Sequence, residues 1–107
     1  MYRILIVDDE KMIREGIKNG MAWKKLGIDS AVATGTGKGA ISELRKEKYD
    51  IVLTDICMEG MSGLELVSEI RKIQPEARII IMTAYDRFDF AQQPLRLHVN
   101  DFLLKPI

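Results

Sequence analysis

Four short runs of mostly apolar residues recur along the chain, each rich in isoleucine, leucine or valine. They read ILIV at 4–7, DIVLT at 50–54, RIIIM at 78–82 and DFLLK at 101–105. None alternates regularly between apolar and polar positions, which is typical of strands buried on both faces of a parallel sheet. A weaker run, IDSAVAT at 28–34, predicts an edge strand.

The stretches between these runs carry apolar residues at helical spacing. The clearest helix is predicted over 63–73, and similar spacing predicts helices from near Lys11 toward Met21, over 38–47 and over roughly 86–96. Strands and helices therefore alternate along the chain. This order predicts an α/β fold with a parallel sheet and helices on both of its faces.

Composition narrows the class of protein further. The chain has 107 residues, which suits one domain, and its 16 basic and 16 acidic residues leave no basic excess for nucleic acid or an anionic membrane. Its one cysteine excludes an intrachain disulfide. No segment has the pattern of a signal peptide or a bilayer span, so we expect a cytoplasmic protein without a membrane partner.

Side chains capable of chemistry follow each of the strong apolar runs. The first run leads to Asp8 and Asp9, the second to Asp55, the third to Thr83, and the last ends at Lys105. Ligands of open parallel sheets bind beyond the carboxyl ends of the strands. We therefore expect three carboxylates, one hydroxyl and one ammonium group to share a crevice.

The charge in this crevice predicts a metal ion. Three carboxylates and one lysine leave an excess of about two negative charges, which mutual repulsion makes unfavourable. Carboxylate oxygens with water in the remaining positions suit Mg²⁺, and a bound cation favours an anionic phosphoryl group nearby. One carboxylate could then act as a nucleophile and form an aspartyl phosphate.

Each of these residues also has an ordinary structural interpretation. Asp8 or Asp9 could cap the helix that begins just after them. Asp55 could close a turn, and Lys105 could be a solvated surface lysine. Their shared position at the same end of four predicted strands favours the site.

The segments that carry these residues resemble the receiver domain of two-component response regulators. ILIVDDE (4–10), DIVLTDICMEGMSGLEL (50–66), IIIMTAYD (79–86) and DFLLKPI (101–107) match the family pattern in order. The resemblance implies a flavodoxin-like, doubly wound sheet of five parallel strands in the order 2-1-3-4-5. It also implies one receiver domain over 1–107 that stops before the family's fifth helix.

The resemblance further implies a role for each site residue. Asp55 would accept the phosphoryl group from a histidine kinase. Asp9 and Asp55 would hold Mg²⁺, with Asp8 assisting through water and the backbone carbonyl of Cys57 as a further ligand. Thr83 and Lys105 would contact the phosphoryl oxygens, and Phe102 would be the aromatic switch residue.

Two longer segments, 2–28 and 83–91, are most similar to regulators with an AraC-type helix-turn-helix output domain. We therefore expect a transcription regulator, not an enzyme, that contacts DNA only through a separate domain. The sequence departs from the family pattern at Glu59, Pro94 and His98. The missing fifth helix should uncover apolar sheet surface, which predicts a homodimer or a segment-exchanged oligomer.

Two other functions stay open on the sequence alone. One is a degenerate receiver that serves only as an interaction module. The other, less favoured, is a phosphatase with an aspartate nucleophile, although Cys57 stands where that chemistry needs a second aspartate. The glycine-rich segment GTGKG at 35–39 departs from the phosphate-binding loop pattern and is interpreted as a flexible turn.

Overall fold

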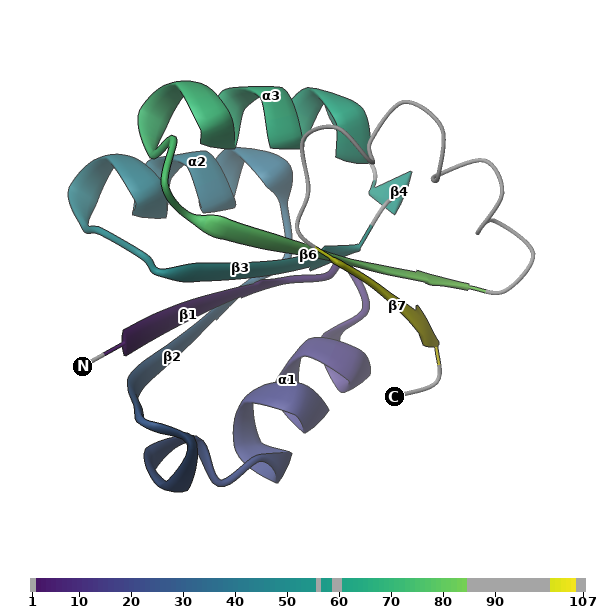
Figure 1. Ribbon diagram of the computed structural model, residues 1–107. Helices are drawn as coiled ribbons and strands as arrows, with labels where there is room; N and C mark the ends of the chain where they lie inside the picture. The colour runs from purple at the N-terminus through teal and green to yellow at the C-terminus, as the bar shows by residue number, and fades with distance from the viewer. Residues whose placement is uncertain (1, 56, 59–60, 85–100, 106–107) are drawn as a thin grey trace.

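Five parallel strands form the central sheet, which runs through the middle of the molecule (Figure 1). The computed structural model describes residues 2–55, 57–58, 61–84 and 101–105, and the side chains of 2–55 and 65–82. The strands are β1 (Tyr2–Val7), β2 (Ile28–Thr34), β3 (Ile51–Asp55), β6 (Arg78–Ala84) and β7 (Asp101–Lys105). Their order is β2-β1-β3-β6-β7. The doubly wound order 2-1-3-4-5 and the edge position of 28–34 are thereby confirmed.

Helices cover both faces of this sheet, as the alternating pattern predicts. The helical elements are α1 (Lys11–Gly20), the 3₁₀ turn η1 (Trp23–Leu26), α2 (Gly37–Lys46) and α3 (Gly63–Ile73). α2 and α3 lie side by side on one face, and α1 lies on the other (Figure 1). Within the described parts of the chain, none of the helices is long and apolar enough to cross a membrane.

The apolar side chains of β1 divide between two cores because successive residues of a strand point to opposite faces. Leu5 and Val7 belong to a buried cluster with residues of α2 and α3, such as Val67. Ile4 and Ile6 belong to a second cluster, against which Ile17 of α1 packs. A continuous apolar run is thus required by a strand with helices on both sides, which is why β1 shows no alternation in its sequence.

Three local features differ from the sequence-based expectations. α2 begins at Gly37, inside the segment interpreted as a turn, and the Thr36 hydroxyl accepts a hydrogen bond from Gly39 N at 2.9 Å. The turn η1 was not predicted; it ends at Gly27, whose φ of 83° lies in the left-handed region. A short antiparallel pair, β4 (Cys57–Met58) and β5 (Met61–Ser62), was not predicted either.

Several predictions concern parts of the chain outside the described residues. These are the helix over roughly 86–96, the departures at Glu59, Pro94 and His98, and the absence of a helix after β7. They stay predictions.

Candidate functional site

Asp8 directly follows β1, and Asp55 is the last residue of the neighbouring strand β3. Val7 at the end of β1 is the register partner of Thr54 in β3, so the next residue on each segment is one of the two aspartates. Neighbouring strands of a sheet are about 4.8 Å apart. The sheet therefore brings these two predicted site residues together at its carboxyl edge.

The register also places the backbones of two further predicted residues at this edge. Asp55 pairs with Met82, the residue before Thr83 in β6. Lys105, the last residue of β7, pairs with Ala84, the residue after Thr83. The strand ends predicted to converge do converge, although the side chains of Thr83 and Lys105 are outside the described set.

Asp8 is completely buried at the start of the loop between β1 and α1. Its Oδ1 accepts a hydrogen bond from Glu10 N at 2.9 Å, and its own N–H donates to Thr34 O at 3.2 Å. The N-cap position of α1 is Glu10, with no side-chain capping bond, so the interpretation of Asp8 or Asp9 as the helix cap is wrong. Asp8 instead closes the loop that presents the acids.

Three consecutive carboxylates gather in this loop. One oxygen from each of Asp8, Asp9 and Glu10 can be chosen so that all lie within 4.8 Å of one another. Asp9 and Glu10 are exposed, whereas Asp8 is buried. Clustered carboxylate oxygens of this kind match the donor set of a hard divalent cation. Glu10 was not among the predicted site residues, although its position directly after two aspartates was a signal for it.

Asp55 ends β3 and retains only 7% of its surface exposed. The Thr54 hydroxyl donates a hydrogen bond to the Asp55 backbone carbonyl at 3.1 Å. Among the residues whose side chains are described, the buried polar or charged ones are Asp8, Thr54 and Asp55. Carboxylates are rarely buried in proteins, so two buried acids at the same edge make this edge the candidate site.

Arg14 is a neighbour of the acids that the sequence analysis did not select. Its Nη1 donates hydrogen bonds to the backbone carbonyls of Asp8 at 3.3 Å and Asp9 at 3.4 Å. The available signal was a basic residue one turn into the helix that follows the acidic pair. Such a side chain points back toward the start of its helix.

The last two predicted site residues are placed only by their backbones. Cys57 opens the short strand β4, directly beyond Ile56 and the end of β3. Phe102 lies in β7, in register with Ile81 of β6. Their proposed contacts, a carbonyl ligand and an aromatic switch, are not tested by the described residues.

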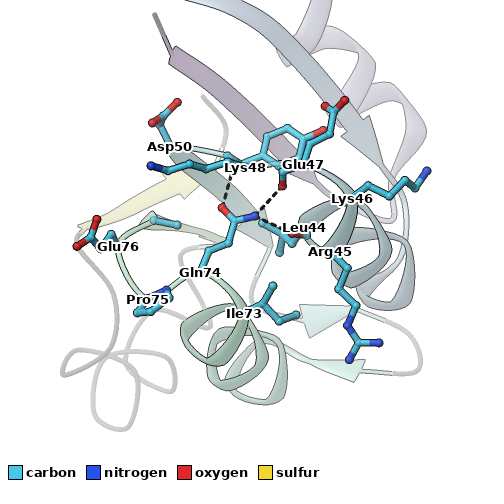
Figure 2. Close-up of a pocket in the computed structure, with 12 residues that line it drawn as sticks. Leu44, Arg45, Lys46, Glu47, Lys48, Asp50, Ile73, Gln74, Pro75 and Glu76 are labelled. Carbon is cyan, nitrogen blue, oxygen red and sulfur yellow. Dashed lines mark hydrogen bonds between the residues drawn. The ribbon is translucent and has the colours of Figure 1, made fainter.

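A cavity of about 610 Å³ lies at the opposite edge of the sheet, where β3 and β6 begin (Figure 2). Gln74 occupies its centre and joins the ends of the two neighbouring helices. Its Nε2 donates to Leu44 O and Glu47 O, each at 2.7 Å, and its Oε1 accepts from Tyr49 N at 2.8 Å. Since this amide already holds the backbone of the α2–β3 connection, the arrangement indicates a structural corner.

Tyr49, in the same corner, is 1% exposed and donates a hydrogen bond from its hydroxyl to Glu43 Oε1 at 3.0 Å. Burial, followed by this hydrogen bond, raises the pKa of Tyr49 to about 12. Hydrogen bonds from Lys46 and then Tyr49 lower the pKa of Glu43. Both shifts favour the pairing of a neutral phenol with a charged carboxylate at neutral pH.

Comparison with known proteins identifies the same fold and family for nearly the whole chain. The family model described as the response regulator receiver domain matches residues 4–107. The transcriptional regulatory protein HptR of Staphylococcus aureus is 32% identical over 107 residues. That alignment covers 100% of this chain but 42% of HptR, so the chain spans about two-fifths of this relative's length.

Two solved structures show the similarity in three dimensions. A two-component transcriptional regulator, AraC, from Clostridium phytofermentans superposes with a TM-score of 0.91 at 34% identity, covering 100% of this chain and 83% of that one. The response regulator TrrA from Thermotoga maritima, in complex with Mg²⁺–BeF, gives a TM-score of 0.84 at 34% identity, covering 100% of this chain and 89% of that one.

Proposed function

The chain belongs to the response regulator receiver domain family, and we propose that it is the phosphoryl-accepting switch of a two-component signalling pathway. The observation that carries the proposal is the level placement of two buried aspartates, Asp8 and Asp55, at the carboxyl edge of the sheet. We also propose that residues 1–107 belong to one receiver domain.

Mg²⁺ is the cofactor that the donor set fits. Asp9 and Asp55 would hold it directly, Asp8 through water, and the Cys57 backbone carbonyl would complete the protein ligands. The oxygen chemistry of the Asp8–Asp9–Glu10 loop supports this assignment, since Mg²⁺ prefers a few carboxylates and several waters. The ion supplies neutralisation of the charge on the phosphoryl oxygens.

Asp55 is the proposed acceptor. One of its carboxylate oxygens attacks phosphorus, and the phosphorus–nitrogen bond of a phosphohistidine in the kinase breaks as the new phosphorus–oxygen bond forms. The histidine nitrogen keeps the bonding electron pair. Asp55 ends β3, the middle strand of the sheet, and this position would orient the attacking oxygen; orientation of the reacting groups is a main source of acceleration in phosphoryl transfer.

The switch itself is assigned to three residues at the ends of β6 and in β7. Thr83 and Lys105 would bind the new phosphoryl oxygens, because a hydroxyl and an ammonium group are natural donors to phosphate. Phe102 would then turn inward as Thr83 moves. The added charge shifts the balance between two conformations, and hydrolysis of the aspartyl phosphate resets it.

The partners follow from the relatives. Named relatives are transcriptional regulators, and the chain covers only part of their length. We therefore assign DNA contact to a separate output domain and assign to this chain the role of a signalling domain without enzymatic turnover. A homodimer or segment-exchanged oligomer remains part of the proposal.

The test is intact mass after incubation with acetyl phosphate, with and without Mg²⁺. We expect one phosphoryl group on the native chain only when Mg²⁺ is present, and none on Asp55→Asn. Asp29→Asn is the matched control, because Asp29 is an exposed acid in the edge strand β2. Its modification should equal that of the native chain.

Three results would count against the proposal. An adduct that persists in Asp55→Asn would place the acceptor elsewhere. A native chain that binds Mg²⁺ but takes no phosphoryl group would favour the interaction module, and repeated turnover of a small phosphate ester would favour the phosphatase.

A further inference from the structure

Arg14 connects helix α1 to the loop that carries the acids. One guanidinium nitrogen, Nη1, contacts two successive backbone carbonyls, those of Asp8 and Asp9, at 3.3 and 3.4 Å. Both distances are near the upper limit of a useful hydrogen bond. A shift of a few tenths of an ångström would therefore break them.

Gly35 makes room for this guanidinium. A Cβ placed on Gly35 would lie 3.0 Å from Arg14 Nη1 and 3.3 Å from Cζ. Gly35 directly follows β2, and its φ is not positive, so the backbone itself does not require glycine. The guanidinium thus lies between the loop after β1 and the loop after β2.

We propose that Arg14 is a positioning residue for the magnesium pocket, holding the Asp8–Asp9 backbone in the geometry that presents the metal-binding carboxylates. This inference rests on the proposed function, because it concerns the same pocket. The hydrogen bonds of Arg14 to this loop go to the backbone oxygens of Asp8 and Asp9, so Arg14 can be changed without removing a carboxylate ligand.

The positive charge of Arg14 should lower the affinity for Mg²⁺, since it repels a cation, and so opposes the proposed effect of positioning the loop. Arg14 is partly exposed, however, and solvent and salt screen the interaction of an exposed charge with its neighbours. Groups that orient metal ligands often change affinity by tenfold or more when removed. When Arg14 is replaced, we therefore expect Mg²⁺ affinity to fall more through lost orientation of the loop than it rises through removal of the charge.

Four variants separate geometry from charge. Arg14→Met keeps an unbranched side chain but loses both bonds, whereas Arg14→Lys keeps the charge on a shorter side chain. Gly35→Ala keeps Arg14 and displaces its guanidinium. Gly16→Ala is the control for that substitution, because a Cβ on Gly16 meets nothing within 4 Å.

The primary measurement is the Mg²⁺ dissociation constant by titration calorimetry. We expect binding to be about tenfold weaker in Arg14→Met, about threefold weaker in Arg14→Lys and Gly35→Ala, and unchanged in Gly16→Ala. A residue that only stabilises the fold would lower the melting temperature of the metal-free protein without changing the affinity of the folded state. Amide hydrogen exchange at residues 8–10, without metal, should be faster in Arg14→Met and Gly35→Ala.

Three outcomes would overturn the inference. Tighter Mg²⁺ binding by Arg14→Met would mean that charge repulsion dominates. Native affinity in both Arg14→Met and Gly35→Ala would mean that the contacts position nothing. A native chain with no Mg²⁺ affinity would overturn the magnesium site as well, which distinguishes failure of the proposed function from failure of this inference alone.

Discussion

Polar groups are arranged differently at the carboxyl edge of the sheet, where the strands end, and at its amino edge, where they begin. At the carboxyl edge, like charges gather, with Asp8 and Asp55 buried and Asp9 and Glu10 beside them. At the amino edge, polar groups pair with complementary partners, as in the three hydrogen bonds of Gln74 (Figure 2). The first arrangement brings together carboxylate oxygens, as a cation site requires, whereas the second pairs donors with acceptors.

This difference favours a structural interpretation of the amino-edge cavity. The amino-edge cavity of about 610 Å³ is lined by groups that hold the chain together. Chemistry is expected where the fold tolerates an unfavourable cluster, because active sites commonly sacrifice stability for function. Substitutions at the two edges should therefore change stability in opposite directions.

The largest effect should follow removal of the Gln74 amide. Gln74→Ala removes the hydrogen-bond partner of Leu44 O at the end of α2 and of Glu47 O and Tyr49 N in the α2–β3 connection. The bonds to Leu44 and Tyr49 are partly buried, and polar groups in such positions are costly to leave unpaired. We expect the free energy of unfolding in urea to fall by about 2–3 kcal/mol. Mg²⁺ affinity should not change, since the acidic loop lies at the other edge.

Two further variants, Gln74→Glu and Glu76→Ala, test whether the stability loss of Gln74→Ala comes from the donated hydrogen bonds. The glutamate variant keeps an acceptor for Tyr49 N but loses both donated bonds, so it should be destabilised as well. Glu76 is exposed in the same corner, and its removal should cost little. Equal stability of Gln74→Ala and the native chain would refute the structural interpretation of the cavity.

A somewhat smaller effect is expected at Tyr49 in alkaline solution. Its pKa is raised from 10.0 to about 12, so the folded state keeps its phenol proton where the unfolded state loses it. This contribution is complete below pH 10 and is lost as the pH rises toward 12. Over that window the native chain should lose up to about 2 kcal/mol more stability than Tyr49→Phe.

Parallel denaturation curves of the two proteins at several pH values give the comparison. Because the two proteins differ only at residue 49, the difference between their curves reports on the Tyr49 hydroxyl. If the curves run parallel between pH 10 and 12, the phenol does not gain its raised pKa from folding.

The sequence predicted most of the fold because each strong strand is a continuous apolar run. The predicted segment 101–105 coincides with β7, and 28–34 coincides with β2. Features held by a single local contact were harder to predict. The turn η1 depends on one glycine with positive φ, and the start of α2 depends on the Thr36 cap, neither of which produces a hydrophobic period.

The candidate site was predictable to the extent that it depends on strand ends. Position after an apolar run selected Asp8 and Asp55, and the sheet register places them level. Arg14 was missed because it bonds to backbone carbonyls, whose positions no sequence motif encodes. The helix-cap interpretation of Asp8 was wrong because the side chain bonds to Glu10 N, one residue before the helix begins.

The smallest effect, and the only stabilising one, is expected from Asp8→Asn in the absence of metal. Asparagine keeps the carbonyl oxygen that accepts the hydrogen bond from Glu10 N, but removes one of three charges clustered within 4.8 Å. We expect the free energy of unfolding to rise by about 1 kcal/mol, whereas Asp29→Asn should leave it unchanged.

Added Mg²⁺ should reverse this ranking, because a ligand stabilises the folded state in proportion to its affinity. The native chain should gain melting temperature with Mg²⁺ and overtake Asp8→Asn, which lacks one acid of the pocket. If Asp8→Asn were less stable than the native chain even without metal, the acidic edge would be a paired structural cluster like the Gln74 corner. The contrast between the two edges, and with it the argument for a metal site, would then fail.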